Sequence, residues 1–181
     1  MQLTYGKDFY MPRDKTITHN KLLPSIKQEF LEHGYEKASL QNIARCAGIT
    51  AAGLYRHFPS KEAMFTAMVE PVTSDFLKMC DISMEETYSR LSDNDFLQNF
   101  NEFRTDKNRE TINYMYDNYD VFRLLLVCSK GTPYEAFEDQ LVEIEMRGTK
   151  DLFHVLDKRG LPHKAVTDNE LHILCTTFVT A

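Results

Sequence analysis

The sequence predicts an all-α protein, and three observations lead to this prediction. Apolar residues recur at helical spacing over most of the 181 residues, and the strict alternation of a half-buried strand is nearly absent. Most of the seven glycines and six prolines lie between amphipathic segments, where they are expected to end helices. Hydrophobic residues make up 43% of the chain and aromatic residues 12%, which is enough to build a packed core.

The first predicted helix spans about residues 18–33 and comes after a loose arm over residues 1–17. Its apolar stripe consists of Leu22, Leu23, Ile26, Phe30 and Leu31. Pro24 lacks a backbone donor, so we expect it in the first turn, with the regular helix starting later than residue 18. Gly34 fits the position just past the end of this helix.

Two short helices are predicted next. Ser39 is the expected N-cap of a helix that ends at Cys46, and Thr50 is the expected N-cap of a helix over residues 51–57. Gly48 permits a tight turn between them. Two short helices joined by a glycine-containing turn and packed on a preceding helix are typical of a helix-turn-helix.

The remaining predicted helices are longer. Ser60 is expected to cap the next helix, and Pro71 is expected to end or kink it. Further helices are predicted near residues 73–91, 94–117, 119–129, 133–159 and 168–181, which brings the total to about nine. We therefore expect a helix-turn-helix domain over residues 18–70 and a larger helical domain over residues 71–181. The chain stops at Ala181 inside an apolar helical run, and the sequence leaves open whether its last helix is complete or truncated.

The start of the third helix, Thr50-Ala51-Ala52-Gly53, consists of small residues. In a helix-turn-helix this end enters the major groove, where small side chains let the backbone approach the base edges and methyl groups can meet thymine methyls. Tyr55 and His57 come about one turn later and can donate hydrogen bonds to phosphate oxygens. Lys61 begins the next helix, where its ammonium and the helix dipole both attract an anion.

Charge is divided unevenly along the chain. The net charge is −6, but residues 1–70 carry nine Lys or Arg against seven Asp or Glu, and residues 71–181 carry twelve against twenty. A mildly basic N-terminal part next to an acidic remainder is consistent with a nucleic-acid partner for the former. Arg45 and Arg56 fit equally well as DNA contacts or as solvated charges.

The run GYEKASLQNIARCAGITAAGLYRHFPSKEAMF resembles the DNA-binding domain of the TetR/AcrR family of transcriptional regulators, and the resemblance extends over about residues 20–68. It implies an all-helical, two-fold dimer whose larger C-terminal domain binds a small molecule. It further implies that Gln41 and residues 50–53 face base edges, while Tyr55, His57 and Lys61 hold phosphates. The residues predicted to contact DNA are therefore Gln41, Arg45, Thr50, Ala51, Ala52, Gly53, Tyr55, Arg56, His57 and Lys61.

The aromatic residues and methionines of the C-terminal part occur at helical spacing, so most are expected in a core. The resemblance implies that some of them line an effector pocket, and those predicted to do so are Phe76, Phe100, Phe103, Met115, Tyr119, Phe122 and Phe137. The terminal helix carries more apolar residues than one core-facing stripe needs, namely Leu171, Ile173, Leu174, Phe178 and Val179. Together with the segment 134–159, this helix is expected to form the dimer interface.

Several other classes of protein are disfavoured. The four cysteines are far apart and have no histidine at metal-ligand spacing, which predicts reduced thiols in a cytoplasmic protein without a metal or another cofactor. We find neither a signal peptide nor a run of roughly 18–20 apolar residues that would span a membrane. An enzyme is not expected, because no Gly-rich phosphate loop, nucleophile elbow or metal-spaced His/Cys motif is present.

We therefore expect a homodimeric DNA-binding transcription regulator, a repressor that leaves its palindromic operator when a small-molecule effector binds. Two alternatives stay open. In the first, the same DNA-binding head has no effector, and the C-terminal domain docks a protein partner, for example in chromosome organisation or cell division. In the second, the chain is a small-molecule carrier that has lost DNA binding, which the presence of Tyr55, His57 and Lys61 disfavours.

Overall fold

The computed structural model describes residues 15–91, 93, 95 and 98–180, and every regular element in these residues is a helix. The eight helices are α1 (Lys15–Lys37), α2 (Leu40–Cys46), α3 (Ala51–Tyr55), α4 (Lys61–Arg90), α6 (Phe100–Asp117), α7 (Tyr119–Val127), α8 (Phe137–Lys158) and α9 (Asp168–Thr180). The predicted all-α fold is thereby confirmed. The predicted arm up to residue 14 and the predicted helix start at residue 94 lie outside the described residues.

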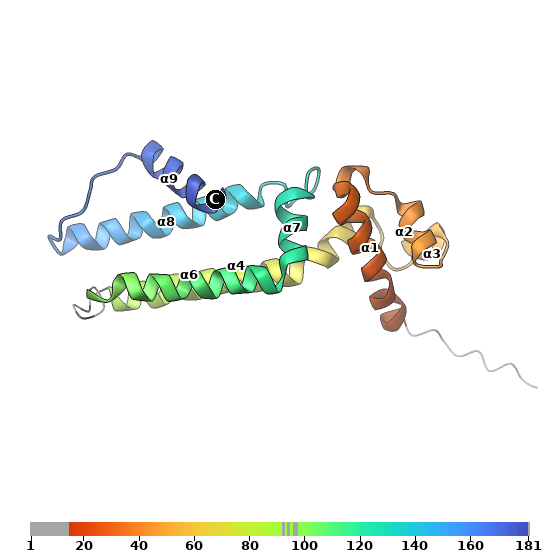
Figure 1. Cartoon of the computed structure of the whole chain (residues 1–181), viewed down its shortest axis with the longest axis horizontal. Coiled ribbons are helices and arrows are strands. Elements are labelled where there is room, and N and C mark those ends of the chain that lie inside the picture. The colour runs from red at the N-terminus through yellow and green to blue at the C-terminus, as the bar shows by residue number, and fades with distance from the viewer. Residues whose placement is uncertain (1–14, 92, 94, 96–97, 181) are drawn as a thin grey trace, which may run out of the picture.

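The molecule is elongated, with α1, α2 and α3 gathered at one end (Figure 1). The long helix α4 leaves this end and runs beside α6 toward the other, while α8 and α9 form a second pair above them. The short helix α7 stands between the two ends and contacts both α1 and α4. None of the described helices combines the length and hydrophobicity needed to cross a membrane.

The three N-caps predicted from the sequence are confirmed. Ser39, Thr50 and Ser60 have extended backbones directly before α2, α3 and α4. Each hydroxyl oxygen accepts a hydrogen bond from the backbone N–H three residues later, at 3.0–3.3 Å. The starts of these helices therefore depend on local side-chain chemistry, which a sequence displays directly.

Two prolines lie inside helices. Helix α1 begins before residue 18 and contains Pro24, and α4 continues through Pro71 for 30 residues in all. The expectation that Pro24 delays the regular helix is wrong, and Pro71 does not end its helix. Pro71 is exposed, whereas Val69 and Thr73 on either side of it are buried, so packing on both sides offsets the one missing backbone hydrogen bond.

The connection between α7 and α8 is longer than predicted, because α8 begins at Phe137 instead of residue 133. Thr132 is buried, donates its hydroxyl hydrogen to the carbonyl of Ser129 at 2.6 Å, and accepts a hydrogen bond from the backbone of Tyr134 at 3.1 Å. Gly131 has a φ of 82°, a conformation that other residues rarely adopt. These side-chain hydrogen bonds form a turn where a helix could otherwise start.

One apolar core links the helix-turn-helix end to the first part of the bundle. Its buried members include Ile26, Phe30, Ile43, Leu54, Phe65, Phe76, Phe122 and Phe137. A smaller core of Val142, Leu171 and Cys175 joins α8 to α9. The boundary at residue 70 that the sequence suggests lies inside α4, and the division into two domains stays a prediction.

Candidate nucleic-acid interface

A tight turn sets the angle between α2 and α3. Gly48 has a φ of 67°, and the backbone N–H of Ile49 donates to the carbonyl of Ala44 at 2.9 Å. Ile43 and Leu54 are completely buried, so the inner faces of both helices pack on the core. The opposite faces of α2 and α3 lie at the end of the molecule, away from the bundle (Figure 1).

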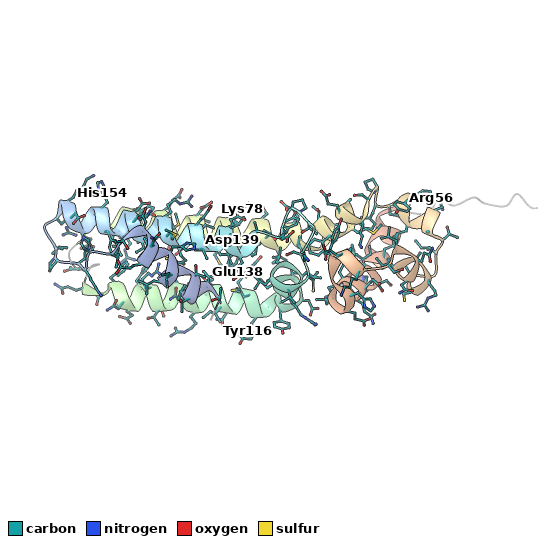
Figure 2. All side chains as sticks on the ribbon, turned by 90° about the horizontal axis from the view of Figure 1, so that it is seen from above. Arg56, Lys78, Tyr116, Glu138, Asp139 and His154 are labelled. Atoms are coloured by element: carbon teal, nitrogen blue, oxygen red, sulfur yellow. The ribbon has the colours of Figure 1, made fainter. Side chains whose placement is uncertain are left out.

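Most side chains predicted to contact DNA are accessible to solvent. Exposed residues are Gln41, Arg45, Thr50, Ala52, Tyr55 and Arg56, and partly buried ones are Ala51, His57 and Lys61. Tyr55 is 49% exposed, so about half of its surface is covered by the protein. Arg56 projects at the far end of the molecule, opposite the end that carries His154 (Figure 2). The structure thus brings nine of the ten predicted residues to accessible positions on and beside the α2–α3 unit.

Gly53 is the exception, because it is buried in the first turn of α3. A Cβ atom at this position would lie 3.3 Å from Thr50 Oγ1 and 3.6 Å from Ile49 Cβ. The small residue therefore makes room for the side chain that caps α3, a role that sequence reasoning missed. That Gly53 faces a base edge stays a prediction.

Thr50 has a capping function in addition to its predicted contact. Its Oγ1 accepts the backbone N–H of Gly53 at 3.0 Å, while the hydroxyl hydrogen of this exposed residue can still be donated. One side chain can therefore stabilise the start of α3 and donate a hydrogen bond to a base or a phosphate.

Lys61 is bound within the protein as well as near the predicted DNA surface. Its Nζ donates to the carbonyl oxygen of Glu36 at 3.1 Å and lies 5.0 Å from the ring centroid of Tyr35. Partial burial lowers the pKa of Lys61, and the carboxylates of Glu29 and Glu36 oppose this shift. An ammonium has three donors, so Lys61 can bind the last turn of α1 and still offer a donor to a phosphate.

Glu29 is a second residue that sequence reasoning missed. It lies on the inward face of α1, three residues after the fully buried Ile26 and next to the fully buried Phe30. A carboxylate within an apolar stripe is the signal that could have identified it. Its Oε1 accepts the backbone N–H of Ser39 at 2.7 Å, which connects α1 to the start of α2.

The predicted effector-pocket residues lie in different surroundings. The rings of Phe76, Phe122 and Phe137 pack against each other, with centroids 5.0–6.5 Å apart. Tyr119 is 61% exposed on α7. Phe100, Phe103 and Met115 are partly buried on α6. A hollow of about 250 Å³ lies beside Phe137 and is lined by residues of α8 and the turn before it. That these seven residues line an effector pocket stays a prediction.

Helix α9 presents an apolar surface to solvent. Its inner face is buried through Leu171 and Cys175, whereas Ile173, Leu174 and Phe178 are each more than half exposed. Both faces of this helix are therefore apolar, as the sequence predicts, and the described part of the chain covers only one of them.

Comparison with known proteins is consistent with this geometry. Residues 22–68 match the family model described as bacterial regulatory proteins, tetR family. The nucleoid occlusion factor SlmA of Haemophilus influenzae is 37% identical over 73 residues, which are 40% of this chain and 34% of SlmA. The A-factor receptor protein of Streptomyces griseus is 37% identical over 57 residues, which are 32% of this chain and 21% of the receptor.

This chain spans about a third of the SlmA sequence it matches. A solved protein from Syntrophomonas wolfei, assigned to the TetR family, superimposes with a TM-score of 0.50. The superposition covers 92% of this chain and 95% of the other at 16% sequence identity, so it supports the shared fold. The match over residues 22–68 includes α2, α3 and the turn between them. The helix-turn-helix part of the chain, residues 22–68, therefore matches the tetR family of bacterial regulatory proteins.

Proposed function

We propose that this protein is a sequence-specific DNA-binding transcription regulator that acts as a homodimer. The observation that carries the proposal is the first turn of α3. Its outer side presents Thr50, Ala51 and Ala52, while its inner side is buried through Gly53 and Leu54. A helix with small side chains on its outer face and a buried inner face can enter a major groove while the core holds its orientation.

The contacts divide into two classes. Gln41, Thr50, Ala51 and Ala52 would read base edges through an amide, a hydroxyl and methyl groups, and their exposed or partly buried positions support this role. Tyr55, His57 and Lys61 would donate hydrogen bonds to phosphates and so fix the position of the protein on the duplex, and their exposed or partly buried positions support this role.

We also propose that α8 and α9 form the dimer interface. The exposed apolar side chains of α9 form a patch of the kind that usually marks a partner surface, and the same patch on a second copy can cover it about a two-fold axis. Two heads held in this way would bind half-sites about 34–36 Å apart, or further apart on a longer operator.

More specifically, we propose that the protein is a repressor that leaves the DNA when a small-molecule effector binds. The match of residues 22–68 to the tetR family supports it, as does the small hollow beside Phe137. A second candidate is a DNA-binding protein that has no effector and docks a protein partner through its C-terminal helices. The close packing of Phe76, Phe122 and Phe137 favours this second candidate, since these rings leave little space between them.

The test is selection of preferred duplexes from a random pool with purified protein, followed by affinity measurements over a range of salt concentrations. We expect a palindromic preferred sequence and an affinity that falls steeply with salt. A small-molecule screen on the selected complex then separates the two candidates, because only an effector-released repressor would be dissociated. Equal affinity for all duplexes at moderate salt would contradict the regulator proposal.

A further inference from the structure

We propose that Glu29 is a positioning residue for DNA recognition. It lies on α1 and completes the N-terminal cap of α2. The inference rests on the proposed DNA-binding function and adds to it a residue outside the DNA surface. Its basis is the set of hydrogen bonds around Ser39.

In a complete capping box, the N-cap hydroxyl accepts the N–H of the third helical residue, and a Glu or Gln at that third position accepts the N–H of the N-cap residue. Half of this arrangement is present within α2. Ser39 Oγ accepts the backbone N–H of Asn42 at 3.3 Å. The third helical residue is Asn42, so the Glu or Gln of a capping box is missing from the sequence of α2 itself.

Glu29 supplies the missing acceptor from another helix. Its Oε1 accepts the N–H of Ser39 at 2.7 Å, a length typical of a charge-assisted hydrogen bond. The side chain of Glu29 is only 9% exposed, and charged residues are rarely buried to this extent unless they are paired. The hydrogen bond therefore joins a buried group on α1 to the first backbone N–H of the α2 cap.

The cap at Ser39 affects recognition because it holds the first turn of α2. Gln41, predicted to face a base edge, lies in this turn, two residues after the cap. A shift of the turn relative to α1 displaces Gln41 and, through the turn at Gly48, also α3. A local capping box would stabilise α2 equally well but would not connect it to α1.

Glu29 also carries a negative charge near other charged groups. The measurements must therefore separate its positioning role from the effect of this charge on DNA binding. His33 Nε2 lies 4.0 Å from Glu29 Oε1, and Glu29 raises the pKa of Lys61 against the effect of burial. Removal of the carboxylate makes this end of the protein more positive. Binding to an arbitrary duplex should therefore stay constant or become slightly tighter, whereas a partly unfolded variant would bind every duplex less well.

The experiment compares Glu29→Ala, Glu29→Gln and the double variant Glu29→Ala/Asn42→Glu with the unmodified protein. Affinities for the preferred duplex and for a random duplex are measured under the same conditions. For Glu29→Ala we expect about a tenfold loss of affinity for the preferred duplex and less than about a twofold change for the random one. Glu29→Gln keeps an acceptor oxygen and should retain part of the discrimination.

The double variant separates positioning from capping. Asn42→Glu restores an acceptor within α2, so we expect slow amide hydrogen exchange at Ser39 to return while discrimination between the two duplexes does not. Glu32→Ala is the matched control, because Glu32 lies on the same helix, is exposed, and has an oxygen 3.9 Å from His33 Nε2 without a bond to Ser39. It should leave both affinities and the exchange unchanged.

Three results would overturn the inference. The first is unchanged amide exchange at Ser39 in Glu29→Ala, the second is an equal loss of affinity for both duplexes, and the third is recovery of discrimination in the double variant. If the unmodified protein prefers no sequence at all, the proposed function fails, and the exchange measurement still reports on the Glu29 cap by itself.

Discussion

The contact between Gly53 and Thr50 predicts an interaction between two substitutions at the start of α3. Thr50→Ala removes the hydroxyl that accepts the N–H of Gly53 at 3.0 Å, and loss of such an N-cap costs about 1 kcal/mol. Thr50→Ser keeps the hydroxyl and should change stability by less than about 0.5 kcal/mol. For a chain of this length, 1 kcal/mol corresponds to a decrease of about 2–4 °C in the melting temperature.

Gly53→Ala should be less favourable in the unmodified background than in the Thr50→Ala background. With Thr50 present, the new Cβ lies 3.3 Å from Oγ1, closer than ordinary van der Waals contact, so the gain in helix propensity of about 1 kcal/mol is lost to crowding and to a disturbed cap. With Thr50→Ala present, Oγ1 is absent and the nearest remaining contact is Ile49 at 3.6 Å. There the substitution should be neutral or stabilising.

Thermal or urea denaturation of the unmodified protein, both single variants and the double variant gives the interaction energy as a double-mutant cycle. We expect an interaction of roughly 1 kcal/mol, with the double variant more stable than the two single effects predict. An effect of Gly53→Ala that is the same in both backgrounds would refute the steric explanation. Selection of preferred duplexes for Thr50→Ser and Thr50→Ala tests base reading separately, because only the former keeps the hydroxyl.

Three further perturbations test the interface, the dimer and the α8–α9 connection. Lys61→Ala should weaken binding to all duplexes alike and reduce the salt dependence of the affinity by about one phosphate contact. A changed sequence preference, measured by titrating several duplexes, would contradict a phosphate contact of Lys61. Ile173→Asp or Phe178→Asp places a charge on the exposed apolar face of α9 and should give monomers in sedimentation experiments. An unmodified protein that is monomeric at micromolar concentration would contradict the proposed interface. The 2.8 Å hydrogen bond to Asp157 raises the pKa of His163 in the folded protein. The stabilisation by this bond is therefore complete below the pKa of histidine in the unfolded chain, about 6.5, and is lost as the pH rises through the pKa of His163 in the folded protein. Melting temperatures should show this loss in the unmodified protein and not in Asp157→Asn, and a pH dependence that is the same in both would refute it.

The sequence by itself determined the features that depend on neighbouring residues. The N-caps at Ser39, Thr50 and Ser60 result from a hydroxyl that reaches the backbone N–H three residues later, and the turn at Gly48 results from a positive φ. Such interactions are complete within one or two turns of chain, so they can be read from residue order. The helical spacing of apolar residues likewise predicted the all-α fold.

Only the tertiary structure decided the features in which distant residues compete for space or partners. Pro71 lacks a backbone donor whatever surrounds it, but the burial of its neighbours decides that α4 continues. The rings of Phe76 and Phe122 are apolar in either case, but the positions of α4 and α7 decide that they touch each other. The bond between Glu29 and Ser39 spans ten residues and depends on how α1 packs against α2, which residue order alone does not specify.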